Sequence, residues 1–210
     1  MNGQFISFEG GEGSGKSTQL KLLASAFEKS GLPFIATREP GGSSGAEMIR
    51  SLLVSGEVDS WDPLTETLLF NAARADHINR LIKPAIAEGK TVICDRFFDS
   101  TLVYQGIGKG LGTAYIKGLH HLIFGSFMPN LTIMLDIAPE EGLKRAGGRT
   151  GNENRFEKLN IEFHKKIRNG FLEIARREPQ RCVVLDATGE ASILHQQIVE
   201  IIRLRCGIAL

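Results

Sequence analysis

The feature that most constrains this chain is a glycine-rich stretch at residues 10–18, directly after a short apolar run at residues 5–9. The stretch reads GGEGSGKST, which fits G-x-x-x-x-G-K-[ST], and apolar residues at helical spacing follow it. Glycines let the backbone wrap closely around a phosphate, while the loop N–H groups and the following helix N-terminus point at the anion. Strand, loop and helix in this order predict a nucleoside triphosphate site. The alternative is a chance match in an ordinary glycine-rich turn.

Two side chains of this loop carry the expected chemistry. Lys16 is expected to reach the β- and γ-phosphates, and the hydroxyl of Ser17 is expected to ligate Mg²⁺. The motif alone does not identify the group that receives the phosphate. The residues expected to contact the triphosphate are Gly10, Gly11, Glu12, Gly13, Ser14, Gly15, Lys16, Ser17 and Thr18.

Composition narrows the class of protein. A chain of 210 residues with 42% hydrophobic and 23% charged residues is typical of one soluble α/β domain. The net charge of +1 gives no reason to expect a nucleic-acid or membrane surface. The three cysteines show no metal-ligand spacing. No apolar run is long enough to span a bilayer, and the N-terminus shows no signal-peptide pattern, so we expect a cytoplasmic protein.

Short apolar runs alternate with stretches of helical periodicity along the chain. This alternation predicts a parallel sheet with helices on both faces, in which ligands bind at the carboxyl ends of the strands. Residues just after each strand are therefore the candidates for function. The predicted strands are residues 5–9, 34–37, 91–95, 131–137 and 182–186.

Arg38 and Glu39 follow the second predicted strand and precede a Pro-Gly-Gly turn. Their position favours ligand binding, and a plain flexible turn is the alternative. Arg50 lies on the next predicted helix, where it faces either a substrate phosphate or solvent.

Residues 63–88 predict one long helix, or two helices joined near Pro84. Apolar residues surround much of this helix, which would suit a dimer interface. Phe70 and Arg74 are four residues apart and share a face. Together they could hold a planar base by stacking and hydrogen bonding. From the residues alone, a half-buried phenylalanine beside a solvated arginine is the more ordinary interpretation.

The third predicted strand ends in Asp95, followed at once by Arg96. An apolar strand ending in a carboxylate resembles a Walker B strand, whose aspartate binds Mg²⁺ directly or through water. An arginine at this edge is a natural phosphate ligand, although an aspartate–arginine pair that only caps the strand is the alternative. The loop expected to start the next helix offers further polar groups: Ser100, Thr101, Tyr104 and Gln105.

Residues 145–158 form a polar, glycine-rich segment that contains Arg145, Arg149 and Arg155. A hinged loop with several arginines is what a phosphoryl-transfer enzyme needs to close over its phosphates, so we favour a lid over a plain surface loop. The five histidines show no ligand spacing, and we assign them no chemistry.

These motifs together resemble the thymidylate kinase family, whose members phosphorylate dTMP to dTDP with ATP. The resemblance covers nearly the whole chain and implies a five-stranded nucleoside monophosphate kinase fold with a mobile lid, and a homodimer. It also implies that the bond between Glu39 and Pro40 is a candidate for the cis form. The strings that carry the resemblance are FEG before the loop, TREPGG at 37–42, LFNAAR at 69–74, DRFFDS at 95–100, YQG at 104–106, LD at 135–136 and NRFE at 154–157.

The resemblance implies roles at the acceptor side. Phe70 matches the residue that stacks on thymine, and Arg74 matches its hydrogen-bonding partner. Arg96 resembles the acceptor-phosphate ligand, with Arg38 near the same phosphate. Ser100, Thr101 and Gln105 match positions that contact the base.

Further implied roles concern the sugar and the lid. Tyr104 resembles the residue that crowds a ribose 2′-hydroxyl, and Glu12 matches an acidic position that reaches the acceptor sugar or its metal shell. The loop at 10–18 carries no arginine, as in bacterial members whose lid supplies the basic residues. Arg149 is the first candidate for that task. Asn154 departs from the family, which often has aspartate there.

Two other classes compete with this interpretation. A kinase of another nucleoside monophosphate would share the fold and the triphosphate loop. A GTPase-type switch would also need such a loop, and residues 186–189 spell D-x-x-G. That match follows the fifth predicted strand, however, and no Asn-Lys-x-Asp motif for guanine is present. We expect residues 186–190 to lie near the donor adenine instead.

Overall fold

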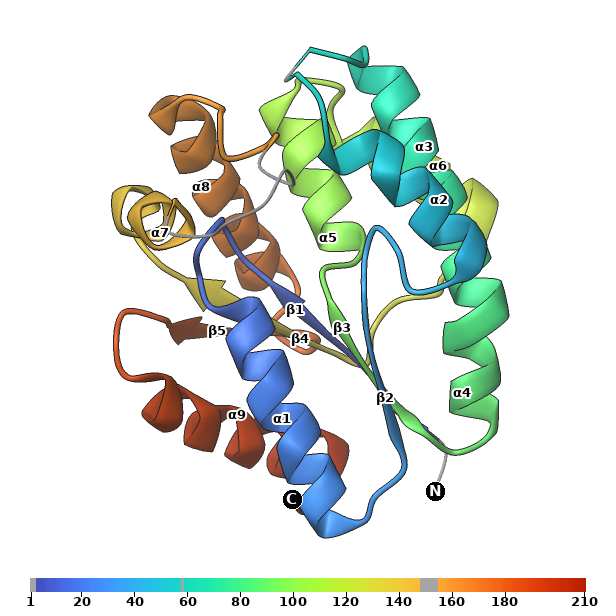
Figure 1. Cartoon of the computed structure of the whole chain (residues 1–210), viewed down its shortest axis with the longest axis vertical. Coiled ribbons are helices and arrows are strands. Elements are labelled where there is room, and N and C mark those ends of the chain that lie inside the picture. Colours follow the sequence, from blue (N-terminus) through green and yellow to red (C-terminus); the bar gives the residue numbers. More distant parts are fainter. Residues whose placement is uncertain (1–2, 58, 148–154) are drawn as a thin grey trace.

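The chain folds into a five-stranded parallel sheet between layers of helices (Figure 1). The structure is a computed structural model that describes residues 3–57, 59–147 and 155–210. The strand order is β2-β3-β1-β4-β5, and neighbouring strands run parallel. All five predicted strands are present, and no boundary differs by more than one residue. The strands are β1 Phe5–Glu9, β2 Phe34–Arg38, β3 Thr91–Asp95, β4 Leu131–Asp136 and β5 Cys182–Asp186.

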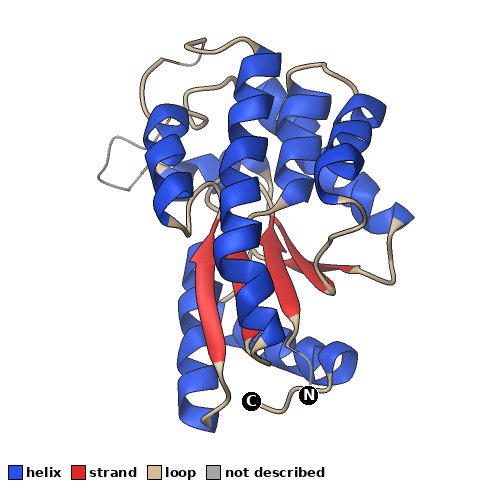
Figure 2. Cartoon of the chain, turned by 90° about the vertical axis from the view of Figure 1, so that its right-hand side faces the viewer, coloured by secondary structure: helices blue, strands red, loops and turns tan. Residues whose placement is uncertain are grey.

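Helices follow the strands along the chain, with two π-helical segments that are labelled η. Figure 2 shows the strands in the lower half of the molecule, with helices extending beyond the ends to which the strands point. The helical elements are α1 Lys16–Ser30, α2 Ser44–Val54, α3 Pro63–His77, η1 Ile78–Ile82, α4 Lys83–Ala87, α5 Phe98–Thr101, η2 Leu102–Gly108, α6 Thr113–Phe124, α7 Pro139–Ala146, α8 Ile161–Arg177 and α9 Ala191–Cys206.

The central strand β1 shows how both faces of the sheet are buried. Ile6 and Phe8 point to one face, where they join a cluster with Leu23 and Phe27 of α1 and apolar residues of α9. Phe5 points to the other face and packs in a second cluster with residues of α4, η2 and α8. A strand that is buried on both faces carries apolar residues on both, as Phe5, Ile6 and Phe8 do here, and this is why the sequence revealed it.

The predicted helix at residues 63–88 is a continuous helical path made of α3, η1 and α4. Its first turn carries Pro63 after Asp62, whose carboxylate caps the backbone N–H groups of residues 64 and 65. The path ends at Ala87, before Gly89, whose φ of 78° is positive. The helix therefore ends where the sequence predicts, and its interior has a π-helical segment that no sequence signal indicated.

The polar segment after β3 differs from its predicted structure. The segment that holds Ser100, Thr101, Tyr104 and Gln105 is helical (α5 and η2) rather than a loop that starts a helix. These side chains are consequently held by helix geometry at the carboxyl end of β3.

Over the described residues, no helix combines the length and the apolar character needed to cross a membrane.

Candidate active site

The glycine-rich loop joins β1 to α1 and encloses its own lysine. The ammonium of Lys16 donates hydrogen bonds to the carbonyl oxygens of Gly10 (3.1 Å) and Gly11 (2.8 Å) and to Ser14 Oγ (3.2 Å). Only 6% of Lys16 is exposed, and burial together with the nearby Arg96 lowers its pKa from 10.5 to about 8. The loop therefore concentrates positive charge at the place where a triphosphate would need it.

Gly13 is the glycine of this loop that packing requires most clearly. Its φ of 67° is positive, and a Cβ built on it would overlap the backbone oxygen of Gly142 in α7. A Cβ on Gly142 would in turn meet the carbonyl oxygen of Glu12. The loop thus rests backbone to backbone on α7, and neither glycine can carry a side chain without displacement.

Ser17 and Asp95 meet at the end of β3, as the metal prediction requires. The Ser17 hydroxyl donates a hydrogen bond of 2.7 Å to a carboxylate oxygen of Asp95. A hydroxyl and a carboxylate are oxygen donors of the kind that Mg²⁺ prefers. Within the described residues, no group of three or more histidine, cysteine or acidic side chains is placed to hold a metal. The donor set therefore fits a metal that takes most of its ligands from phosphate and water.

Arg96 connects the triphosphate loop to the rest of the pocket. One of its terminal nitrogens donates to the carbonyl of Gly10 (3.0 Å) and to Ser100 Oγ (3.1 Å), and the other donates to Glu12 (2.9 Å). Its φ of 70° is the one positive value at a non-glycine residue in the part of the chain that is described. Such a backbone costs roughly 1–2 kcal/mol, which the surrounding hydrogen bonds must offset.

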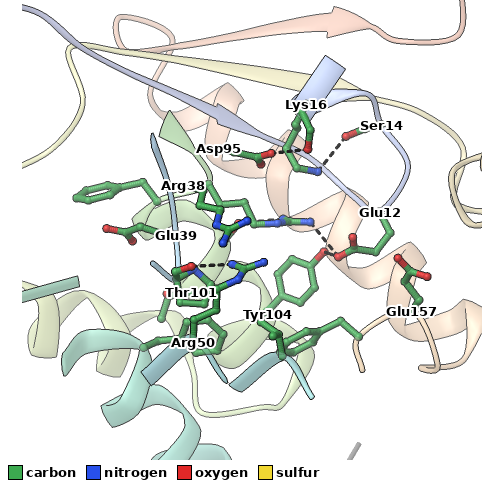
Figure 3. A pocket seen from close by; sticks show the side chains of 18 of the residues that line it. Glu12, Ser14, Lys16, Arg38, Glu39, Arg50, Asp95, Thr101, Tyr104 and Glu157 are labelled. Atoms are coloured by element: carbon green, nitrogen blue, oxygen red, sulfur yellow. Dashed lines mark hydrogen bonds and ion pairs between the residues drawn. The ribbon is translucent and has the colours of Figure 1, made fainter. Parts of the chain in front are cut away.

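The carboxylate of Glu12 is held by two partners. Besides Arg96, the Tyr104 hydroxyl donates to it a hydrogen bond of 2.8 Å, and Figure 3 shows the two side chains pointing toward one another. Burial alone would raise the pKa of Glu12, but Arg96, Lys16 and the bond from Tyr104 together lower it to about 2. A carboxylate beside a phosphate site is thereby kept ionised.

Glu9 organises the turn that carries Arg96. Its fully buried carboxylate accepts hydrogen bonds from the backbone N–H of Phe97 (2.8 Å) and from Ser100 Oγ (2.6 Å). Burial and the neighbouring charge of Asp99 raise the pKa of Glu9 to about 7. The residues after β3 are thus fixed from the end of β1.

The opposite wall of the pocket is built around Arg74, which is 2% exposed. Its Nε donates to Glu39 (2.7 Å), and one terminal nitrogen donates to Thr101 Oγ1 (2.9 Å). His77 Nδ1 lies 3.0 Å from the other oxygen of Glu39. Burial would raise the pKa of Glu39, but Arg74 and His77 lower it below its ordinary value. The second terminal nitrogen of Arg74, Nη1, is buried without a hydrogen-bond partner among the described residues.

These walls enclose a cavity of about 300 Å³, seen from close by in Figure 3. The cavity brings together most of the predicted site residues, from the glycine-rich loop to η2. The predicted residues that line it are Glu12, Gly13, Ser14, Gly15, Lys16, Ser17, Arg38, Phe70, Arg74, Asp95, Arg96, Ser100, Thr101, Tyr104 and Gln105. The other lining residues are Glu39, Pro40, Arg50, Val54, Phe97, Phe156 and Glu157.

Comparisons with known proteins identify the family of the chain. A sequence profile of the thymidylate kinase family matches residues 8–198. A thymidylate kinase of Caulobacter vibrioides is 51% identical over 206 residues, covering 98% of this chain and 99% of that protein. One of Dinoroseobacter shibae is 53% identical over 184 residues, or 88% of each chain. The chain belongs to the thymidylate kinase family.

A solved structure extends the agreement to the fold. The thymidylate kinase of Ehrlichia chaffeensis superposes with a TM-score of 0.79 at 34% identity, covering 96% of this chain and 100% of that one. Both the predicted family and the predicted fold class are confirmed. The peptide bond between Glu39 and Pro40, which the family resemblance made a candidate for the cis form, is cis in this chain.

Two of the three predicted lid arginines, Arg145 and Arg155, lie among the described residues. Arg149 lies outside the described residues. Arg145 donates to the carbonyls of Ala187 (2.8 Å) and Thr188 (3.1 Å), next to the segment expected near the adenine. Arg155 does not line the cavity: it is 1% exposed and forms a 2.6 Å ion pair with Glu66. A buried carboxylate therefore holds the guanidinium that we expected at a phosphate.

Sequence reasoning missed several residues of the site. Glu39 was singled out, but its pairing with Arg74 and His77 was not, although Arg74 and His77 are three apart and share a helix face. Phe156 lines the cavity next to Tyr104, with ring centroids 5.6 Å apart. Only its place in the NRFE string pointed to it. Gly10, Gly11 and Thr18 belong to the loop without lining the cavity.

Proposed function

We propose that this chain transfers the γ-phosphate of ATP to dTMP, giving dTDP and ADP. The observation that carries the proposal is the pairing, in one cavity, of a triphosphate loop with a buried arginine that has an unused donor. Arg74 can only donate hydrogen bonds, so the group it recognises must be an acceptor such as a base carbonyl. At ring position 4, thymine carries a carbonyl oxygen, which accepts a hydrogen bond, whereas cytosine carries an amino group, which donates one. An arginine donor at this position therefore favours thymine over cytosine.

The aromatic residues suit a base and a deoxyribose. Phe70 and Phe156 both line the cavity, with ring centroids 6.3 Å apart and ring planes tilted by 47°, and either ring could stack on a planar base. The Tyr104 ring lies beneath the Arg96 guanidinium, with 5.2 Å from the guanidinium carbon to the ring centroid. We infer that Tyr104 leaves no room for a 2′-hydroxyl and that Thr101 and Gln105 contact the base.

The charged residues suit phosphoryl transfer between two phosphates. An oxygen of the acceptor phosphate forms a bond to the γ-phosphorus while the bond to the bridging oxygen breaks, and ADP leaves. Phosphate is itself a good nucleophile, so the protein needs to position the groups and neutralise charge rather than remove a proton. Lys16 neutralises charge on the triphosphate. Arg96 and Arg38 bind the acceptor phosphate, and for this Arg96 gives up its hydrogen bond to Glu12 and donates to the phosphate instead.

Two further groups complete the proposed site. Ser17 and Asp95 would hold Mg²⁺, which would supply neutralisation of the negative charge on the triphosphate. Arg149 is the lid residue proposed to reach the transferred phosphoryl group, and Arg145 supports the lid from the donor side. We take residues 1–210 as one kinase domain, with the lid at about 145–158.

We also propose a homodimer. Several of the exposed apolar side chains belong to α2, α3 and α6, which are drawn on the upper right-hand side of Figure 1. Leu122 of α6 is the most exposed of them, at 82%. Apolar surface of this extent suits a second copy of the chain. The residues are Met48, Leu52, Leu64, Leu68, Tyr115, Leu122 and Ile123.

The test is ADP release from Mg-ATP with each nucleoside monophosphate in turn. Turnover mainly with dTMP is the expected result. Turnover mainly with another monophosphate would keep the kinase chemistry and discard the base-site assignments. If no acceptor supported turnover and guanine nucleotides bound tightly, the chain would be a switch rather than a metabolic enzyme.

A further inference from the structure

Glu66 is a fully buried carboxylate (0% exposed) that receives donors from two other parts of the chain. Oε1 accepts a hydrogen bond of 2.8 Å from Gln105 Nε2. Oε2 accepts one of 2.8 Å from Lys109 Nζ and forms the 2.6 Å ion pair with a terminal nitrogen of Arg155. The carboxylate of Glu66 on helix α3 therefore contacts both the η2 region and Arg155, which lies in the last part of the predicted lid segment.

Arg155 extends this cluster to the end of α2. Its Nε donates to the carbonyl of Glu57 (2.8 Å), and a terminal nitrogen donates to the carbonyl of Leu53 (3.1 Å), the residue before the cavity-lining Val54. A guanidinium buried to this degree needs a negative partner, because an uncompensated charge in the interior is strongly destabilising. Glu66 is that partner, so it determines where Arg155 can lie.

The cluster lies behind the wall of the cavity. Glu66 does not line the cavity, whereas Gln105 and Phe156 do. The guanidinium carbon of Arg155 lies 5.4 Å from the centroid of the Phe156 ring, and the Phe156 ring meets Tyr104 nearly edge-on, at 86°. Moving Arg155 would therefore move Phe156 against Tyr104, and releasing Gln105 would loosen a second side chain of the same wall.

We propose that Glu66 is a positioning residue for the acceptor nucleotide. One carboxylate oxygen of Glu66 fixes the orientation of the Gln105 side chain through a hydrogen bond. The other oxygen fixes the position of Arg155, which in turn packs against the Phe156 ring. The base-binding wall is then complete only when the chain after residue 154 is docked on α3. This role deepens the function proposed above and rests on it, because it concerns the dTMP side of the cavity and leaves the triphosphate loop untouched.

The test measures steady-state kinetics of Glu66→Gln and Arg155→Met with each substrate varied in turn. Both variants are expected to raise the KM for dTMP about 10- to 100-fold, since small misplacements of binding groups have effects of this size. The KM for ATP is expected to stay unchanged. A residue that served stability alone would lower the fraction of active enzyme, and hence kcat, while leaving both KM values as they were.

The choice of variants keeps the proposal open to refutation. Arg155→Met leaves Glu66 neutralised by Lys109, so it decides the question if Glu66→Gln does not fold. Glu200→Gln is the matched control, because Glu200 pairs with Arg203 on the solvent-exposed side of α9 and its loss should change neither KM. A folded Arg155→Met with the dTMP KM of the parent protein would overturn the proposal. Failure of the parent protein itself to use dTMP would instead refute the proposed function.

Discussion

Replacing Lys16 by methionine should stabilise the nucleotide-free protein while removing most of its turnover. The ammonium of Lys16 is buried, and its pKa falls from 10.5 to about 8, first because of burial and then because of Arg96. At 1.36 kcal/mol per pH unit, a fall of this size corresponds to roughly 3 kcal/mol by which the charged amine destabilises the folded chain. Loss of the hydrogen bonds to Gly10 and Gly11 offsets part of this gain.

The expected gain in the free energy of unfolding at pH 7 is therefore about 1–3 kcal/mol, or roughly 2–10 °C in Tm. Turnover should fall by at least about 10²-fold, because the lost charge faces the transferred phosphoryl group. The measurements are thermal unfolding without nucleotide and ADP release with saturating substrates. Lys21→Met is the control: Lys21 lies on the exposed side of the same helix, and its loss should alter neither quantity much.

The pH dependence gives a second check on the same reasoning. Between about pH 8 and 10.5 the unfolded chain keeps a proton on this lysine that the folded chain has lost, so the parent protein gains stability as pH rises. Lys16→Met lacks this contribution. The stability difference between the two proteins should thus be full below pH 8 and vanish toward pH 10.5. A variant less stable than its parent at pH 7, with no convergence at high pH, would refute the argument.

Four other predictions concern the metal, the sugar, the lid and the subunit interface. Asp95→Asn should raise the Mg²⁺ concentration for half-maximal activity about tenfold, as metal titrations can measure; an unchanged requirement would remove Asp95 from the metal site. Tyr104→Ala should narrow the preference for dTMP over its ribose counterpart, compared as kcat/KM, and unchanged discrimination would assign that role elsewhere. Arg149→Ala should lower kcat about 10²-fold with little effect on KM, because lid charge matters most in the transition state; a change confined to KM would contradict this. Leu122→Glu should convert the proposed dimer to monomers in sedimentation, since a charge cannot be buried unpaired at an interface, and an unchanged mass would exclude this face.

The sheet could be predicted from the sequence because its signals are local. Strands such as Phe5–Glu9 are short runs made mostly of apolar residues, and Gly89 marks the end of the helical path in the same direct way. The triphosphate loop was also evident, since a fixed spacing in one short stretch supplies its lysine and its hydroxyl. In these places a few neighbouring residues decide the structure.

The rest of the site depends on contacts between distant residues, and these left no local signal. Arg155 was predicted to face a phosphate because the sequence around it is polar and rich in glycine. Its actual partner, Glu66, lies in another element, and nothing in either stretch indicated that the two would meet. The π-helical segments are a similar case, because ordinary helical periodicity describes their sequences equally well.

The contact between Gly13 and Gly142 limits how this protein could be recombined with its relatives. The glycine-rich loop and α7 touch through backbone atoms, so a side chain at either position would push the two segments apart. A chimera that took the loop from one relative and α7 from another would work only if both donors kept glycine at these two places. Although the loop and α7 are far apart in the sequence, a chimera should therefore take both segments from the same relative.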